Sequence, residues 1–229
     1  MYFFKILFIS SLLFTTAASV FTASASDAKG CTVKDEWLNT TRYDHRVDYS
    51  NKIETDFFML VYSNSPRFCD YMSRQNLLNK VRFQCGSSND FGWVIHGLWG
   101  ESRAAYISGK RNGHPRFCKG NLPPLDIDVM KPYLCMSPGT KLLQGEWEKH
   151  GACDFSSAKA YFDKTKALFE RFAVPPKKLS AKQAIRWMKD NNPSLRNKRL
   201  DLSGREFGIC FTTAFEVMSC PKKRRISKY

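Results

Sequence analysis

The stretch around which the rest of the chain is organised is residues 146–153, Glu-Trp-Glu-Lys-His-Gly-Ala-Cys. Apolar residues at helical spacing lead up to Gly151, a pattern that predicts a helix ending at this glycine. In such a helix Glu146, Lys149 and His150 share one face. A carboxylate, an ammonium group and an imidazole on one face suit a reaction that moves a proton and stabilises negative charge developing at phosphorus or at a carbonyl. For this stretch alone, a surface helix with an ordinary i, i+4 pair is an equal alternative.

A second stretch, residues 93–100, reads Trp-Val-Ile-His-Gly-Leu-Trp-Gly and adds another histidine. Its apolar start predicts a buried strand that Gly97 ends, with His96 at the end of the strand and Trp99 just beyond it. Because an imidazole titrates near neutral pH, two histidines can supply one neutral and one protonated group at the same pH. The two stretches together favour a catalytic interpretation over a purely structural one.

The composition indicates an exported, basic, single-domain protein. The 229 residues suffice for one domain with a sizeable core. Residues 1–25 have the pattern of a cleaved secretory signal, and their apolar run is too short for an uncleaved membrane anchor. Lysine and arginine number 36 against 21 aspartates and glutamates, a net charge of +15 that favours a polyanionic partner, either nucleic acid or an acidic surface.

The cysteines point to disulfides rather than to a metal site. All eight follow the signal segment, and their even number in an oxidising compartment predicts four disulfides. Their spacing alone does not choose among the possible pairings. Neither a C-x-x-C nor an H-x-x-x-H spacing occurs, so we expect no metal and no other cofactor.

Apolar runs, helical periodicity and breaker residues predict the remaining elements. Strands are expected at 57–62, 206–213 and 215–219, the last two as a hairpin. Helices are expected from Asp70 through Leu78, at 126–134, at 161–172, and from a capping box at 180–183 to the breaker at 191–193. Residues 101–124 read as a basic loop, and the charge run at 222–225 as a solvated tail. Strands and helices without regular alternation indicate the α+β class.

With both stretches in view, the chain resembles the ribonuclease T2 family of exported endoribonucleases. Residues 93–100 are similar to the family's segment F-x-I-H-G-L-W-P, and residues 145–153 to its segment H-E-W-x-K-H-G-T-C. Weaker similarity at 60–69, 208–210 and 219–221 extends the resemblance over most of the chain. It implies a central antiparallel sheet flanked by several helices, in one disulfide-stapled domain over residues 26–229 with a short basic tail at 222–229.

The resemblance also implies a reaction and the roles of the site residues. His96 and His150 would transfer protons while the ribose 2′-OH attacks the adjacent phosphorus, with His150 given the role of base and His96 that of acid. The product would be a 2′,3′-cyclic phosphate that can be hydrolysed to a 3′-phosphate, without a metal. Lys149 and Glu146 would stabilise the pentacoordinate phosphorus. Trp99 would orient His96 or pack against the ribose.

Aromatic side chains near these motifs are candidates for contacts with RNA bases, because single-stranded RNA is commonly held by stacking. We select Tyr62, Phe91 and Trp99. Trp93 and Trp147 lie inside apolar segments, which favours a place in the core. The resemblance further implies three disulfides and, with them, a fourth. They are Cys69–Cys85, Cys118–Cys153, Cys210–Cys220 and Cys31–Cys135.

Several positions depart from the family's pattern. Gly145 stands where many members have a third histidine that contacts phosphate, a role for which His45 and His114 are less favoured than ordinary structural roles. Asn64 replaces a tryptophan of a base-binding wall, which puts base preference in doubt. Gly100 replaces a proline, and its freedom would loosen the chain after Trp99.

The leading interpretation is a monomeric, secreted or periplasmic endoribonuclease that cleaves single-stranded RNA with low base specificity and does not insert stably in membranes. The second is a catalytically weak relative that binds RNA or another polyanion on the same basic surface, as a toxin or signalling protein. A third, a cationic membrane-active protein, depends on charge alone, and it predicts activity that survives replacement of both histidines.

Overall fold

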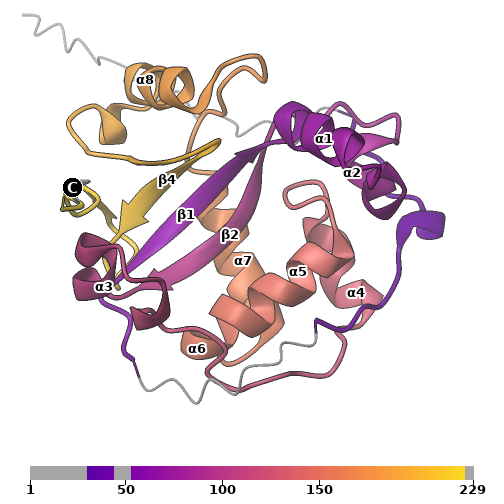
Figure 1. Ribbon diagram of the computed structural model, residues 1–229, viewed down its shortest axis with the longest axis horizontal. Helices are drawn as coiled ribbons and strands as arrows, with labels where there is room; N and C mark the ends of the chain where they lie inside the picture. Colours follow the sequence, from indigo (N-terminus) through magenta and orange to yellow (C-terminus); the bar gives the residue numbers. More distant parts are fainter. Residues whose placement is uncertain (1–29, 44–52, 225–229) are drawn as a thin grey trace, which may run out of the picture.

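An antiparallel sheet of five strands forms the centre of the computed structural model, which describes residues 30–43 and 53–224 (Figure 1). The predicted signal segment, His45 and the tail beyond residue 224 lie outside the described residues. The strands are β1 (Phe57–Asn64), β2 (Trp93–Glu101), β3 (Asp201–Ser203), β4 (Glu206–Phe211) and β5 (Val217–Met218). Their order is β2-β1-β4-β3, and β5 pairs with β4. The predicted α+β class with a central antiparallel sheet is confirmed.

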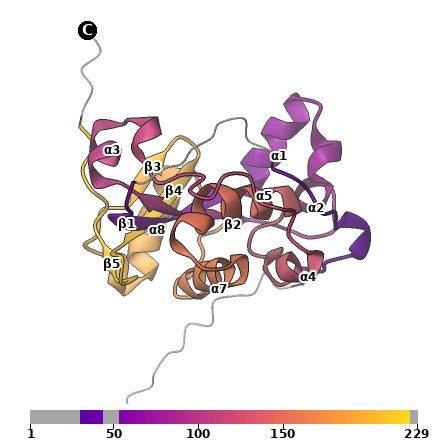
Figure 2. The same cartoon turned by 90° about the horizontal axis from the view of Figure 1, so that it is seen from below.

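Helices surround this sheet on several sides. α5 and α7 contact β2, and α8 contacts β3 and β4 at the other end of the strand order (Figures 1 and 2). The capping box predicted at residues 180–183 opens α8, with both of its hydrogen bonds present. The α-helices are α1 (Ser65–Arg74), α2 (Arg82–Cys85), α3 (Arg103–Ser108), α4 (Ile127–Met130), α5 (Thr140–Glu146), α6 (Ala152–Asp154), α7 (Ala158–Phe169) and α8 (Ala181–Asn191). Short 3-10 helices are η1 (Asp35–Trp37), η2 (Leu78–Val81), η3 (Arg111–Gly113), η4 (Lys131–Tyr133) and η6 (Pro193–Leu195). The element η5 (Trp147–Gly151) is a single turn of π-helix, hereafter the π-turn.

The ends of several predicted elements differ from the structure by a few residues, and three larger differences concern the first helix, the strand β2 and the expected loop 101–124. The first helix starts at Ser65 rather than near Asp70, because the Asn64 side chain caps it by accepting from the backbone N–H of Arg67 and Pro66 fits its first turn. The strand β2 continues through Gly97 to Glu101, held by pairing with β1. The expected loop 101–124 contains α3 and η3.

The alternating residues of β1 divide the core into two layers. Phe58, Leu60 and Tyr62 face the large cluster formed with the helices. Met59 and Val61 face the opposite side, together with Trp99 of β2. Because strand side chains alternate, this second, smaller cluster lies on the side of the sheet opposite the large cluster. Trp93 and Trp147 belong to the large cluster, as predicted.

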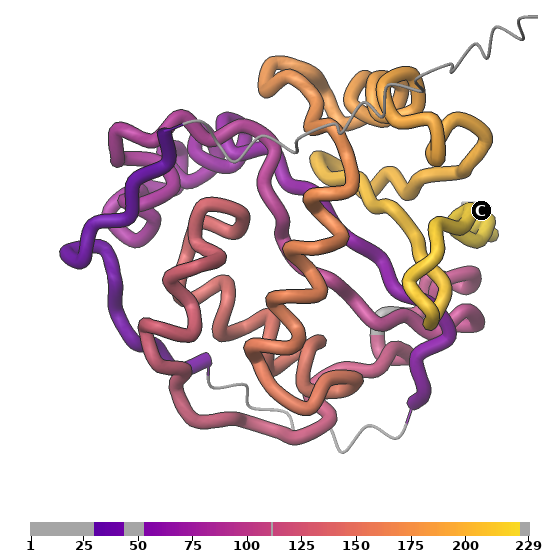
Figure 3. The backbone as a smooth tube through the Cα atoms, turned by 180° about the vertical axis from the view of Figure 1, so that it is seen from behind, coloured from indigo at the N-terminus to yellow at the C-terminus, as the bar shows by residue number. Residues whose placement is uncertain are grey.

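Four disulfides staple the fold, and they are the four that the resemblance implied. Cys31–Cys135 ties residues 30–43 to the region before α5, and this segment runs along the edge of the molecule beside α2 and α4 (Figure 1); Figure 3 shows the same edge from behind. Cys118–Cys153 ties the segment after η3 to α6, directly behind the π-turn. None of the described helices is long and apolar enough to cross a membrane.

Candidate active site

A bulge in β2 presents His96. Val61 pairs with Gly97 and the next residue of β1, Tyr62, pairs with Ile95, so His96 is an extra residue without a partner on β1. Such a bulge re-aims a side chain without ending the strand. The backbone N–H of Leu98 at this irregularity is satisfied by the hydroxyl of Tyr161, at 3.0 Å. The imidazole of His96 is 34% exposed.

A π-turn presents His150. The helix expected at 146–151 is α-helical only as far as Glu146, and residues 147–151 form a wider turn before α6. π-turns are rare and are frequently found at functional sites. His150 is buried, and within the described part of the chain neither of its ring nitrogens has a hydrogen-bond partner. The ring therefore keeps a free nitrogen that can accept a proton.

Glu146 lies between the two histidines. Its Oε2 accepts from Trp99 Nε1 at 2.7 Å, its Oε1 is 3.4 Å from His96 Nε2, and its Oε2 is 3.8 Å from His150 Nε2. This approach requires glycine at position 97, because a Cβ there would lie 1.8 Å from Glu146 Oε2. Gly97 therefore allows the carboxylate to lie against the strand, where it bridges β2 and the helix.

The indole of Trp99 orders both imidazoles. It stacks on His150 with ring centroids 5.1 Å apart and an interplanar angle of 9°. It meets His96 edge to face, at 5.2 Å and 78°. The aromatic contacts and the Glu146 hydrogen bond fix Trp99 between the two histidines.

A second carboxylate, Glu206 at the start of β4, was missed by the sequence analysis. Its Oε1 lies 2.8 Å from His96 Nδ1, so His96 contacts one carboxylate at each ring nitrogen. Glu206 is 110 residues from His96 in the chain and belongs to no local motif. The only available signal was that the predicted hairpin begins at this residue.

The two imidazoles have opposite proton affinities. Burial disfavours the charged form of His96, but Glu146 and Glu206 outweigh it and raise the pKa of His96 from 6.5 to about 10. Burial, followed by the positive charges of Arg116 and Lys149, lowers the pKa of His150 well below 6.5. Near neutral pH, His96 is therefore protonated and His150 is neutral.

Lys149 places a positive charge beside this pair. It forms no ion pair with any described residue, so its ammonium group can bind an anion. Burial lowers the pKa of Lys149, the negative charge of Glu146 opposes this shift, and the positive charge of Arg116 adds to it. Arg116 itself binds Glu101, with Nη2 2.8 Å from Oε1, and His114 binds the other oxygen of this carboxylate. The positive charge of Arg116 is thereby partly balanced, and that of Lys149 is left for a ligand.

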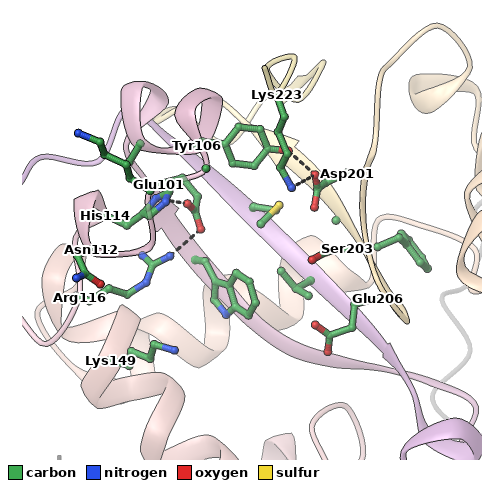
Figure 4. Close-up of a pocket in the computed structure, with 18 of the residues that line it drawn as sticks. Glu101, Tyr106, Asn112, His114, Arg116, Lys149, Asp201, Ser203, Glu206 and Lys223 are labelled. Carbon is green, nitrogen blue, oxygen red and sulfur yellow. Dashed lines mark hydrogen bonds and ion pairs between the residues drawn. The ribbon is translucent and has the colours of Figure 1, made fainter. Parts of the chain in front are cut away.

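A pocket of about 520 Å³ opens beside these residues, over the apolar face of Met59 and Val61 (Figure 4). Lys149, Arg116 and His114 line one side, while Glu206, Ser203 and Asp201 line the other. Opposing charged walls over an apolar floor suit a ligand that has both an apolar ring and charged groups.

The start of the expected solvated tail, residues 222–224, lies beside this pocket, and Lys223 is one of the residues that line it. Lys223 Nζ binds Asp201 Oδ1 at 2.8 Å and lies 4.8 Å from the ring centre of Tyr106. Tyr106 donates its hydroxyl hydrogen to the same oxygen at 2.5 Å. The backbone N–H of Arg224 donates to the carbonyl of Ile107. Residues 222–224 are exposed, as expected of a solvated tail, but Lys223 also binds the buried carboxylate of Asp201, which needs a cationic partner.

Comparisons with known proteins show the family of the chain. The sequence model of the ribonuclease T2 family matches residues 55–197, well over half of the chain. The chain belongs to the ribonuclease T2 family. A probable ribonuclease of Haemophilus influenzae is 44% identical over 185 residues, 80% of this chain and 66% of that relative. A ribonuclease of Aeromonas hydrophila is 30% identical over 100 residues, which cover 44% of this chain and 38% of that relative. The chain thus spans just under two thirds of the first relative's length and well under half of the second's.

Among solved structures, trichomaglin, described as a novel S-like ribonuclease, has the same fold. It superposes with a TM-score of 0.53 at 19% identity, over 75% of this chain and 94% of that chain. The two motifs that carried the resemblance to the ribonuclease T2 family thus lie on the fold that the resemblance implied.

Two of the three aromatic residues selected for base contacts are in the core. Tyr62 is 0% exposed and stacks on Phe207 at 4.7 Å, and Phe91 is 5% exposed against Phe83. A base cannot stack on a ring whose faces are already covered, so the structure corrects these two assignments. Trp99 alone of the three lies at the site of this ribonuclease T2 family member.

The departures from the ribonuclease T2 motifs have structural explanations. The ring of Tyr43 fills the space at Gly145, since a Cβ there would lie 2.9 Å from two of its carbons. Asn64, a cap of α1, also donates to the carbonyl of Lys177 at 2.8 Å and is buried. Gly100 does not loosen the chain after Trp99. It pairs with β1, and a Cβ there would lie 2.5 Å from Thr55 Oγ1. Within the described part of the chain, no group of three or more His, Cys, Asp or Glu side chains is placed to hold a metal ion.

Proposed function

We propose that this protein is an endoribonuclease that cleaves single-stranded RNA by transphosphorylation through a 2′,3′-cyclic phosphate. The observation that carries the proposal is the pair of imidazoles beside one carboxylate, with the pKa of His96 raised and that of His150 lowered. A reaction that removes one proton and delivers another requires this combination of acid and base at one pH. The ribonuclease relatives named above support the same activity.

In the proposed reaction, His150 accepts the proton of the ribose 2′-OH as the 2′-oxygen forms a bond to phosphorus. The bond from phosphorus to the 5′-oxygen breaks, and His96 donates its proton to that oxygen. Lys149 and the protonated His96 stabilise the charge on the phosphoryl oxygens, and Glu146 keeps His96 protonated until the transfer. These side chains supply both proton transfer and positive charge, so the proposal needs no metal.

Access to the base is a step of its own. His150 is 2% exposed and the indole of Trp99 covers one face of its ring. Entry of the ribose therefore requires Trp99 to shift, and a shifted indole remains able to pack against the sugar. Trp99 is proposed both to orient the two imidazoles and to contact substrate.

The proposed substrate and setting follow from charge and from the disulfides. A net charge of +15 attracts a polyanion, and the pocket beside Lys149 has the apolar floor that a base needs. Four disulfides and the signal-like residues 1–25 support export to the periplasm or the medium, where we propose that the protein acts as a monomer of low base specificity.

The experiment that tests this function uses the disulfide-intact protein, single-stranded RNA and EDTA. We expect wild-type protein to produce 2′,3′-cyclic phosphate ends, detected by mass spectrometry, and His96→Ala and His150→Ala each to lower the rate by at least about a hundredfold. Thermal unfolding of each variant checks that the fold is kept. RNA binding by the wild type without cleavage, or cleavage that persists in both folded variants, would overturn the proposal.

A further inference from the structure

A second, smaller groove lies on the far side of Glu206 from the main pocket. It measures about 270 Å³ and shares two lining residues with that pocket, Ser203 and Glu206. Figure 4 shows both on the side of the pocket opposite His114. Since Glu206 binds His96, the groove begins one side chain away from the acid. Its other lining residues are Ser63, Asn64, Arg67, Phe68, Tyr71 and Arg205.

The groove combines an exposed aromatic ring with two arginines. Tyr71 is 46% exposed, a high value for a large ring on a helix whose other face packs on the fold. Arg205 lies over it, with Cζ 5.7 Å from the ring centre. Arg67 and Arg205 are both exposed, and neither forms an ion pair with any other described residue. This contrasts with Arg116 in the main pocket, which a carboxylate partly neutralises.

These features match the chemistry by which proteins hold single-stranded nucleic acid. Bases stack on exposed aromatic rings whatever their sequence, and guanidinium groups bind phosphate through paired hydrogen bonds. The position of the groove relative to His96 decides which part of an RNA chain can reach it. His96, as the acid, faces the leaving 5′-oxygen, and Glu206 and the groove lie on the other side of His96 from Glu146. The groove thus faces the part of the RNA that leaves with the 5′-oxygen, on the 3′ side of the cleaved bond.

We propose that this groove is a subsite for RNA on the 3′ side of the leaving nucleoside, with the next phosphate on Arg67 and Arg205 and the next base on Tyr71. The inference rests on the proposed endoribonuclease function and adds to it a preference for chains that extend beyond the cleaved dinucleotide. It also assigns a direction, because an extension on the 5′ side does not reach the groove.

The test uses DNA oligonucleotides that contain a single ribonucleotide, so that only one bond can be cleaved. The shortest is the dinucleotide. Two others carry two extra deoxynucleotides, one on the 3′ side and one on the 5′ side of that bond. We expect the 3′ extension to raise kcat/KM of the wild type about tenfold or more, and the 5′ extension of equal charge to raise it less.

Variants then separate the groove from the catalytic site. Tyr71→Ala should reduce kcat/KM on the 3′-extended substrate roughly five- to a hundredfold, and Arg205→Gln roughly tenfold, with the dinucleotide cleaved as before. Tyr71→Phe keeps the ring and should retain the preference. Arg74→Gln removes a charge from the same helix outside the groove and serves as the matched control.

Each outcome bears on one proposal. If the wild type cleaves no substrate, the proposed function fails and the groove is not the cause. If it cleaves all three but gains nothing from the 3′ extension, the subsite proposal is overturned. The same holds if Tyr71→Ala and Arg205→Gln lower the rates on the dinucleotide and on the 3′-extended substrate equally, since that pattern indicates a structural role.

Discussion

Replacing Glu206 by glutamine should narrow the active pH range from its alkaline side. His96 must be protonated to act as the acid, so activity falls as the pH rises through its pKa of about 10. Glu206 Oε1, at 2.8 Å from His96 Nδ1, favours the protonated form. The variant Glu206→Gln keeps an oxygen at this position and removes the charge, so the pKa of His96 decreases.

The size of this decrease follows from the contact. A hydrogen bond to a charged group contributes roughly 1.5–3 kcal/mol, and one pKa unit corresponds to about 1.36 kcal/mol. Since the imidazole is 34% exposed, water screens the charge and the lower half of this range applies. We expect the alkaline limb to move down by about one pH unit, while Glu146 continues to hold the pKa above its usual value.

Two measurements check this expectation. One is the pH profile of kcat/KM on an RNA oligonucleotide, and the other is an NMR titration of the His96 ring, which needs no activity. Glu206→Asp keeps the charge and should restore the limb in part, and Glu216→Gln removes an exposed carboxylate elsewhere on the same hairpin and should leave it in place. The role given to Glu206 would be refuted if, in Glu206→Gln, neither the alkaline limb of the kcat/KM profile nor the pKa of the His96 ring measured by NMR decreased.

Three further predictions concern the fold around the site. Gly97→Ala places a Cβ 1.8 Å from Glu146 Oε2, so we expect an unfolding free energy lower by roughly 1–3 kcal/mol in urea titrations and a large loss of cleavage; a fully stable, active variant would contradict the close approach. Replacing Cys31 and Cys135 by serine opens a loop with a sequence separation of 104 and should cost roughly 2–5 kcal/mol, more than opening the loop with a separation of 10 closed by the last disulfide; thermal unfolding in the opposite order would count against it. Below about pH 6.5, His150 binds a proton in the unfolded chain but not in the folded one, so the unfolding free energy decreases as the pH is lowered, by up to about 1.4 kcal/mol per pH unit. In urea titrations at several pH values, His150→Gln should show a smaller decrease per pH unit than the wild type, and an equal decrease would contradict this assignment.

The sequence predicted best what local chemistry determines. The capping box before α8, the continuous apolar run of β1 and the core position of Trp147 each depend on neighbouring residues, and all are present. The cap at Asn64 was also readable, because Pro66 near it is typical of a helix start, but Asp70 was preferred. Local patterns thus located the elements more reliably than their ends.

Features that depend on tertiary contacts were not readable. Tyr62 lies in a strand buried on both faces, and an apolar run does not reveal which faces are covered. Glu206 on β4 contacts His96 on β2 only because both strands pair with β1, which lies between them. The docked Lys223 depends on Asp201, a carboxylate whose buried position no local sequence pattern indicates.

Both histidines occupy one-residue irregularities, the bulge at His96 and the π-turn that contains His150. Each irregularity is equivalent to an insertion in an otherwise regular element. A deletion of one residue at either place would leave a well-formed strand or helix, but it would turn the histidine to the opposite face of the sheet or by about 100° around the helix axis. In this fold, then, single-residue insertions and deletions are a direct route between a catalytic and a purely structural scaffold, with little change in the core.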